Sequence, residues 1–198
     1  MKIVKQSVTL IQISDNADQL IEDAARVCYQ SWDKKKPGSK ERLIKHLIKS
    51  GHHSVLEHAF TTFKIVTNRA ISHEIVRHRI ASYSQESTRY VAYKNEIEVI
   101  KPYGLEEGTE EYKIWYDIIE KIEKKYKDLL DLGVPPQNAR DILPNCLKTE
   151  LYMTANFREW RHFIKLRSSK QAHPQIRELA IMIRLELQER YPILFEDL

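Results

Sequence analysis

The sequence has few cysteines and glycines and no long apolar run, and these absences limit the classes of protein to consider. Cys28 and Cys146 are the only cysteines among 198 residues, too few for a disulfide framework or a cysteine-rich metal site. The five glycines are scattered, so the chain has neither a dinucleotide-binding fingerprint nor a P-loop. No stretch reaches the ~20 apolar residues of a membrane span, and a signal-peptide pattern is absent. We therefore expect a cytoplasmic protein that holds any nucleotide with side chains.

The composition is that of a globular chain with nearly balanced charge. Hydrophobic residues make up 42% and charged residues 30%, and 32 Lys+Arg against 28 Asp+Glu leave a net charge of +4. This mild excess suits a small anionic ligand as well as nucleic acid. A nucleic-acid-binding module therefore remains an alternative, although no RNA- or DNA-binding motif is present. The length predicts one domain over 1–198.

Residue patterns predict a mixture of strands and helices. Strands are expected at 2–14, 59–67 and 146–155, and a strand or hairpin at 91–100. Helices are expected at 17–30, 40–50, 69–79, 109–132, 136–142, 157–167 and from the break at 172–174 to about 190. Because these elements do not alternate regularly as β-α-β, we expect an α+β fold with a mainly antiparallel sheet flanked by helices. In the first helix, Leu20, Ile21 and Cys28 are assigned to the apolar core face.

Two of the predicted helices follow an asparagine and carry paired functional side chains. Asn68 is expected to cap the helix at 69–79, on which Glu74, Arg77 and His78 would share one face. Asn156 is expected to cap the helix at 157–167, on which two residues four positions apart share a face, namely Arg158 and His162.

The densest group of such side chains lies in the stretch Arg77–Tyr90. Arginines place paired donors on phosphate or carboxylate, and the Ser, Thr and Gln residues that follow add short-range donors and acceptors. For the helix face with Glu74, Arg77 and His78 taken alone, the simpler interpretation is a surface salt bridge worth ~0.5 kcal/mol. The polar run directly behind it favours a site for a small phosphorylated ligand.

Three histidines fall within seven residues, at His52, His53 and His58. Their spacing matches none of the usual zinc motifs, and no cysteine lies nearby. A metal-dependent hydrolase is one alternative that they leave open. Hydrogen bonding beside a ligand, a subunit contact and ordinary loop histidines are the others, and we expect no metal site.

The order Arg77-His78-Arg79, then seven residues, then Ser87 resembles the signature of the flavin-dependent thymidylate synthases. The match continues to Tyr90, and the resemblance extends upstream to Gly51 and downstream to Arg167. It implies reductive methylation of dUMP to dTMP with methylenetetrahydrofolate as carbon donor and FADH2, reloaded by NADPH, as reductant. It also implies a homotetramer with active sites shared between subunits.

The resemblance also implies which residues form the site. FAD contacts are expected from Ser54, Arg77, His78, Arg79, Gln85, Asn156, Phe157, Arg158 and His162. Substrate contacts are expected from Glu74, Arg77, Gln85, Glu86, Ser87, Thr88, Arg89, Arg140 and Arg167.

Particular roles follow for a few of these residues. The resemblance makes Arg167 the catalytic group, which favours loss of the uracil N3 proton, and it makes Arg140 a phosphate ligand in a neighbouring subunit's site. Gln85 stands where other members carry an acid, and it can still bond the ribose. Neither cysteine lies near the motif, and the route implied by the family needs no enzyme nucleophile. No base arrangement is evident around Ser87, so we assign it to phosphate or sugar binding. His52 and His53 are suspected of contacting the folate.

Overall fold

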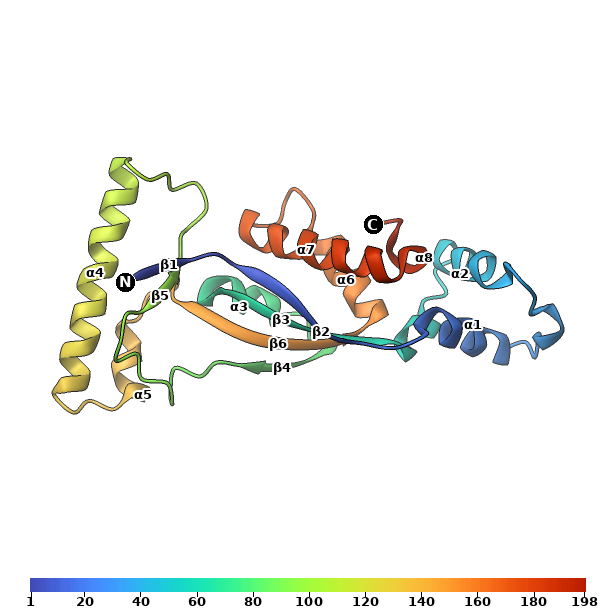
Figure 1. The fold of residues 1–198 in the computed structure, drawn as a ribbon, viewed down its shortest axis with the longest axis horizontal. Helices are drawn as coiled ribbons and strands as arrows, with labels where there is room; N and C mark the ends of the chain where they lie inside the picture. Colours follow the sequence, from blue (N-terminus) through green and yellow to red (C-terminus); the bar gives the residue numbers. More distant parts are fainter. The chain divides into compact units, whose positions relative to one another are not determined.

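The computed structural model describes residues 1–198 as a mixture of strands and helices (Figure 1). The strands are β1 (Lys2–Val4), β2 (Ser7–Ile13), β3 (Phe60–Asn68), β4 (Ala81–Gln85), β5 (Glu98–Ile100) and β6 (Lys148–Asn156). The helices are α1 (Ala17–Val27), α2 (Ser39–Lys49), α3 (Arg69–Ile75), α4 (Glu110–Asp131), α5 (Pro136–Ala139), α6 (Phe157–Arg167), α7 (Pro174–Arg190) and α8 (Pro192–Phe195), with 3-10 turns η1 (Trp32–Lys34), η2 (Ser54–His58) and η3 (Arg140–Ile142). None of the helices combines the length and the apolar character that a membrane crossing requires.

The strands form two sheets. Four of them pair in the order β2-β3-β6-β4, and β1 pairs in parallel with β5. Strands β3 and β6 run in opposite directions, because Arg69 N donates to Leu147 O at one end and Phe157 N donates to Ala59 O at the other. The fold class is therefore α+β with a mainly antiparallel sheet, as the sequence predicted.

Two compact units divide the chain. Unit 1 comprises residues 1–7, 65–77 and 84–151, and unit 2 comprises residues 8–64, 78–83 and 152–198. Each strand of the four-stranded sheet contributes residues to both units. The prediction of one domain over 1–198 stays a prediction.

Unit 1 is built around α4, which Figure 1 shows in yellow. Thr109 caps α4, since its Oγ1 accepts a hydrogen bond from Tyr112 N. The buried side of the helix packs on a small apolar cluster formed by Ile97, Val99, Ile119 and Leu147. This agrees with the helix predicted at 109–132, whose apolar stripe turns inward at Ile119 and Tyr126.

Unit 2 is built around α6 and α7, which lie side by side in Figure 1. Asn156 Oδ1 accepts from Glu159 N and starts α6 as predicted. Trp160 is fully buried, donates from Nε1 to Thr61 O at 3.0 Å and packs edge-on against Phe63. The apolar contact and the hydrogen bond together fix how α6 sits on β3 within this unit.

The structure corrects the predicted helix at 69–79. Asn68 does cap it, but α3 ends at Ile75, and the chain turns as Arg77 N donates to Glu74 O. Glu74, Arg77 and His78 therefore do not share a helix face. Beyond the turn, the backbone oxygen of His78 accepts from the hydroxyl of Tyr83 at 2.7 Å, so it is bonded to a side chain and not to a helical N–H.

The region after the motif also differs from the prediction. Residues 81–85 were interpreted as a polar loop, but they form β4, and the strand expected at 91–100 is only β5, at 98–100. Side chains along β4 alternate between half-buried and exposed. Small serines at the exposed positions gave this strand no apolar alternation to detect.

Helix α1 buries only part of the face that was predicted: Ile21 is buried as expected. Cys28 lies beyond its last residue and is exposed, and Leu20 is 43% exposed, so both assignments to the core were wrong. The face that contains Ile21 continues through Glu22 and Arg26, which are buried as an ion pair. A hydrophobic pattern cannot reveal a charged pair that is satisfied inside the fold.

Candidate functional site

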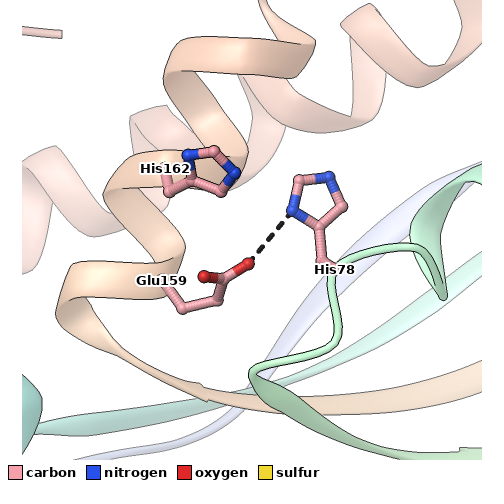
Figure 2. Close-up of side chains that lie close together, drawn as sticks. All are labelled: His78, Glu159 and His162. Atoms are coloured by element: carbon pink, nitrogen blue, oxygen red, sulfur yellow. Dashed lines mark hydrogen bonds and ion pairs between the residues drawn. The ribbon is translucent and has the colours of Figure 1, made fainter.

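The imidazole of His78 is the centre of a polar cluster in unit 2. Figure 2 shows it opposite Glu159 and His162, which both project from α6. His78 is 4% exposed, and its Nδ1 lies 3.1 Å from Glu159 Oε1. The His162 ring is more exposed and lies 5.5 Å away between centroids. The cluster thus joins the motif at 77–90 to the helix at 157–167.

The other ring nitrogen of His78 is bonded to the last residue of α6. Arg167 Nε donates to His78 Nε2 at 3.1 Å. The half-buried guanidinium of Arg167 is therefore positioned by a residue that comes from the Arg-His-Arg motif. The structure brings together two of the predicted site residues, His78 and Arg167, that are 89 positions apart in the chain.

Burial sets the charge states in this cluster. It lowers the pKa of His78 to about 4, and the positive charges of Arg167 and His162 act in the same direction. Burial also raises the pKa of the Glu159 carboxyl, and His162 opposes that rise. His78 is therefore neutral at pH 7, so the fixed positive charge of Arg167 has no charged imidazole beside it.

A pocket of ≈ 910 Å³ opens beside the cluster within unit 2. It is lined by apolar, cationic, acidic and neutral hydrogen-bonding groups: Ile48, His53, Glu57, Ile80, Asn156, Arg158, Glu159, Arg161, His162, Lys165, Ser168, Asp197 and Leu198. A second pocket of ≈ 390 Å³ shares His53 and Arg158 with it and includes Ser54. The predicted residues Ser54, Asn156, Arg158 and His162 therefore line these two pockets.

The pocket suits a ligand with an aromatic part and negative charges. Arg158 is exposed and pairs only with Glu57, which is also exposed, so this ion pair is worth ~0–1 kcal/mol and a phosphate can compete for the arginine. Lys165 adds a second cation, while Ile48 and Ile80 offer apolar surface. Arg161 is committed to Asp197 and to the backbone oxygen of Leu194.

Phe157 and Arg79 lie apart from the pocket lining. Phe157 is fully buried and stacks edge-on against Phe195, so its side chain belongs to the core, and only its backbone could face a ligand. Arg79 is exposed. Their predicted contacts with FAD stay predictions.

The remaining predicted residues belong to unit 1, where Arg140 approaches the polar run. Its Nη1 donates to Thr88 Oγ1 at 3.4 Å, and Ser87 Oγ accepts from Arg89 N at 3.3 Å. Arg77 and Arg89 are exposed. Unit 1 therefore brings one arginine, Arg140, to a hydroxyl group of the polar run, while Arg77 and Arg89 are exposed cations that suit a phosphate.

Gln85 and Glu86 are held by hydrogen bonds within unit 1. Gln85 Nε2 donates to Ser72 Oγ at 2.9 Å and to Thr149 Oγ1 at 3.1 Å. Glu86 Oε1 accepts from the hydroxyl of Tyr93 at 2.7 Å. These contacts fix both side chains before any ligand is present.

Sequence reasoning missed Glu159. It lies three residues after the capping Asn156, where an acid is expected to satisfy the helix N-terminus. Its carboxylate instead faces His78, from a distant part of the chain. Only its spacing of three residues from His162 hinted at a shared cluster.

The histidines at 52, 53 and 58 do not gather around a common point that could hold a metal. The one group whose ligand atoms lie within 4.8 Å of one another is His78, Glu159 and His162. Arg167 places a permanent positive charge 3.1 Å from His78 Nε2, which opposes a cation there. We therefore interpret this group as a hydrogen-bond network, and the hydrolase alternative loses its support.

Comparisons with known proteins agree with the motif. A family model described as thymidylate synthase complementing protein matches residues 9–193. A flavin-dependent thymidylate synthase of Mycobacterium avium is 39% identical over 202 residues, covering 93% of this chain and 80% of that protein, and one of Mycobacterium tuberculosis is 38% identical with the same coverage. A solved structure of the UMP/dUMP methylase PolB from Streptomyces cacaoi, bound with 5-Br dUMP, has a TM-score of 0.83 at 26% identity and covers 99% of this chain and 96% of its own.

The lowered pKa of His78 makes a prediction about stability. Between pH 6.5 and about 4, His78 binds a proton in the unfolded chain but not in the folded one. The contribution of His78 to the free energy of unfolding is therefore fully present above pH 6.5 and is lost as the pH drops toward 4. The loss amounts to up to about 3 kcal/mol. Urea unfolding at pH 4.5, 5.5 and 6.5 should show this slope, and His78→Gln should flatten it. Above pH 7 the two curves should run parallel; equal slopes below pH 6.5 would contradict the assignment.

Proposed function

The chain belongs to the flavin-dependent thymidylate synthase family, and from this premise we propose that it converts dUMP to dTMP by reductive methylation. The observation that carries the proposal is the contact between the Arg-His-Arg motif and the end of α6, where His78 meets Arg167. The family model spans both segments. The site thus combines the signature motif with a fixed cation next to a pocket.

FAD is the flavin that we propose for unit 2. Its pyrophosphate would be held by Arg158 and Lys165, and hydrogen bonds to the rest of the flavin would come from Asn156, His162 and Ser54. Side chains must do this work because the chain has no glycine-rich phosphate loop. When bound, the flavin supplies reducing equivalents, with NADPH as their source and methylenetetrahydrofolate as the carbon donor.

The phosphate of dUMP is assigned to the arginines of unit 1. Arg77 and Arg89 of one subunit would provide charge together with Arg140 of a neighbouring subunit, while Ser87 and Thr88 would provide hydrogen bonds. The hydroxyl of Ser87 already accepts from a backbone N–H, which favours a binding role over a nucleophilic one.

Gln85 fits this assignment although other members carry an acid there. Both N–H groups of its amide have acceptors, Ser72 and Thr149. The group that it can offer to the ribose is therefore its carbonyl oxygen, an acceptor as a carboxylate is. The change from acid to amide preserves the type of hydrogen bond.

Arg167 is proposed as the group that acts on the uracil ring. Its guanidinium stays charged at every working pH, and its planar fork can meet a carbonyl and a ring nitrogen together. Beside uracil it would favour the N3-deprotonated ring and so make C5 more nucleophilic. His78 fixes its position before substrate binds.

A homotetramer with shared sites is proposed on the family resemblance. The outer face of α4 supports association, because Ile114 and Ile118, one turn apart, are 63% and 49% exposed. In this arrangement Arg140 would serve a neighbouring subunit's site.

Arg158→Ala should weaken FAD binding about tenfold or more, because a charge-assisted contact to the pyrophosphate is lost. FAD affinity can be measured by quenching of flavin fluorescence, and the natural cofactor by chromatography after heat release. Arg42→Ala on α2, an exposed arginine outside both pockets, is the matched control and should bind normally. If both variants bind FAD with equal affinity, Arg158 does not contact the flavin.

Arg167→Ala should lower dTMP formation by ~10²–10³ while FAD content stays normal, because a preorganised charge acts on the transition state. Arg167→Lys should also be impaired, since it keeps the charge but not the fork. Turnover and bound flavin are measured on the same sample. Normal turnover with a lowered melting temperature would show that Arg167 only stabilises the end of α6 and has no part in the reaction.

Shared sites predict complementation between subunits. Arg89→Ala and Arg140→Ala should each be nearly inactive, and mixing them under conditions that exchange subunits should restore part of the activity, because some sites then receive both arginines. Light scattering should give the mass of four chains. No recovery from a mixture that demonstrably exchanges subunits would show that one subunit supplies both residues.

A further inference from the structure

We propose that Glu159 is a positioning residue for Arg167, acting through the ring of His78: the Glu159 carboxylate selects the His78 tautomer that accepts a hydrogen bond from Arg167. The inference rests on the role proposed for Arg167. It concerns three side chains in unit 2, of which Figure 2 shows Glu159 and His78.

The donors and acceptors permit one proton arrangement. An arginine Nε–H can only donate, so the His78 Nε2 atom that lies 3.1 Å from it must accept. A neutral imidazole that accepts at Nε2 carries its proton on Nδ1. That proton faces Glu159 Oε1 at 3.1 Å, which must then accept it.

Each alternative leaves two hydrogens facing each other or a bond unmade. The other neutral tautomer places an N–H at Nε2 against the N–H of Arg167, and the imidazolium does the same. A protonated Glu159 that donated to Nδ1 would force that wrong tautomer. The ionised carboxylate is therefore the state that keeps Arg167 bonded to the ring.

The ring has little freedom to satisfy Arg167 in another way. His78 is 4% exposed and lies edge-on to Phe163 with centroids 4.8 Å apart. Tyr83 donates to its backbone oxygen at 2.7 Å. Glu159 and Arg167 are eight residues apart, two turns of α6, so one rigid helix holds both ends of the chain of hydrogen bonds.

The titratable groups around His78 determine how far the pH can fall before this chain of hydrogen bonds is lost. His78 faces Glu159, His162 and Arg167, and the hydroxyl of Tyr83 lies in the field of the Glu159 carboxylate. Burial raises the pKa of Glu159 above its ordinary value. As the pH falls, protonation of this carboxyl should release the His78 tautomer and then Arg167.

The test combines a rate with a direct view of the tautomer. Glu159→Ala should lower kcat about 10- to 100-fold, the usual cost of losing a group that orients a functional histidine, while the KM for dUMP and the flavin content change less than twofold. Glu189→Gln, an exposed acid on α7, is the control and should leave kcat unchanged.

The decisive measurement is a double-mutant cycle. If Glu159 acts through Arg167, the variant with both residues changed to Ala should be no slower than Arg167→Ala alone. Additive losses would overturn the inference. Should Glu159→Ala fail to fold, Glu159→Met, which keeps a side chain of similar length but has no oxygen to accept the Nδ1 proton, is used in the same cycle with the same expectation.

Nitrogen NMR of protein labelled at histidine separates this inference from the proposed function. The wild-type His78, assigned by its loss in His78→Gln, should show a proton on Nδ1 and none on Nε2, and Glu159→Ala should shift it toward the other tautomer. A proton on Nε2 in the wild type overturns the inference whatever the activity. Absence of dTMP formation with the expected tautomer would instead count against the proposed function.

Discussion

The burial of one neutral imidazole is the constraint on which the site in unit 2 depends. His78 can remain buried because both ring nitrogens have partners, Glu159 on one side and Arg167 on the other. The backbone oxygen of the same residue accepts from the hydroxyl of Tyr83, in the segment that follows the end of α3 at Ile75. A buried polar group of this kind is costly unless every bond is made, so the surrounding elements must fit it closely.

The ligands proposed for this chain are anions, and the structure meets them with side chains. In unit 2 the cations next to the pocket are Arg158 and Lys165, and the partner of Arg158 is weakly bound and exposed. Arg161 is the contrasting case, because its ion pair and backbone contact tie the helix to the C-terminal segment. Cations that bind ligands and cations that hold the fold together are therefore distinguished by their partners.

Much of the fold could be predicted because local signals dominate there. The capping asparagine and the spacing of apolar residues located α6 from its first residue to its last, and the break at 172–174 located the start of α7. The errors lie where tertiary contacts override local preference. Helix α3 stopped short, β4 lacked an apolar pattern, and the core face of α1 contains a charged pair in place of Cys28.

The sequence by itself determined the family, through the spacing of Arg77-His78-Arg79 and Ser87, and with it the chemistry that the chain is expected to perform. Only the tertiary structure decided that His78 bonds to Arg167 and that Glu159 faces His78, because these contacts join residues 81 and 89 positions apart. A motif records which residues are present in a segment. Which nitrogen of a buried histidine carries the proton depends on partners that folding brings from elsewhere in the chain.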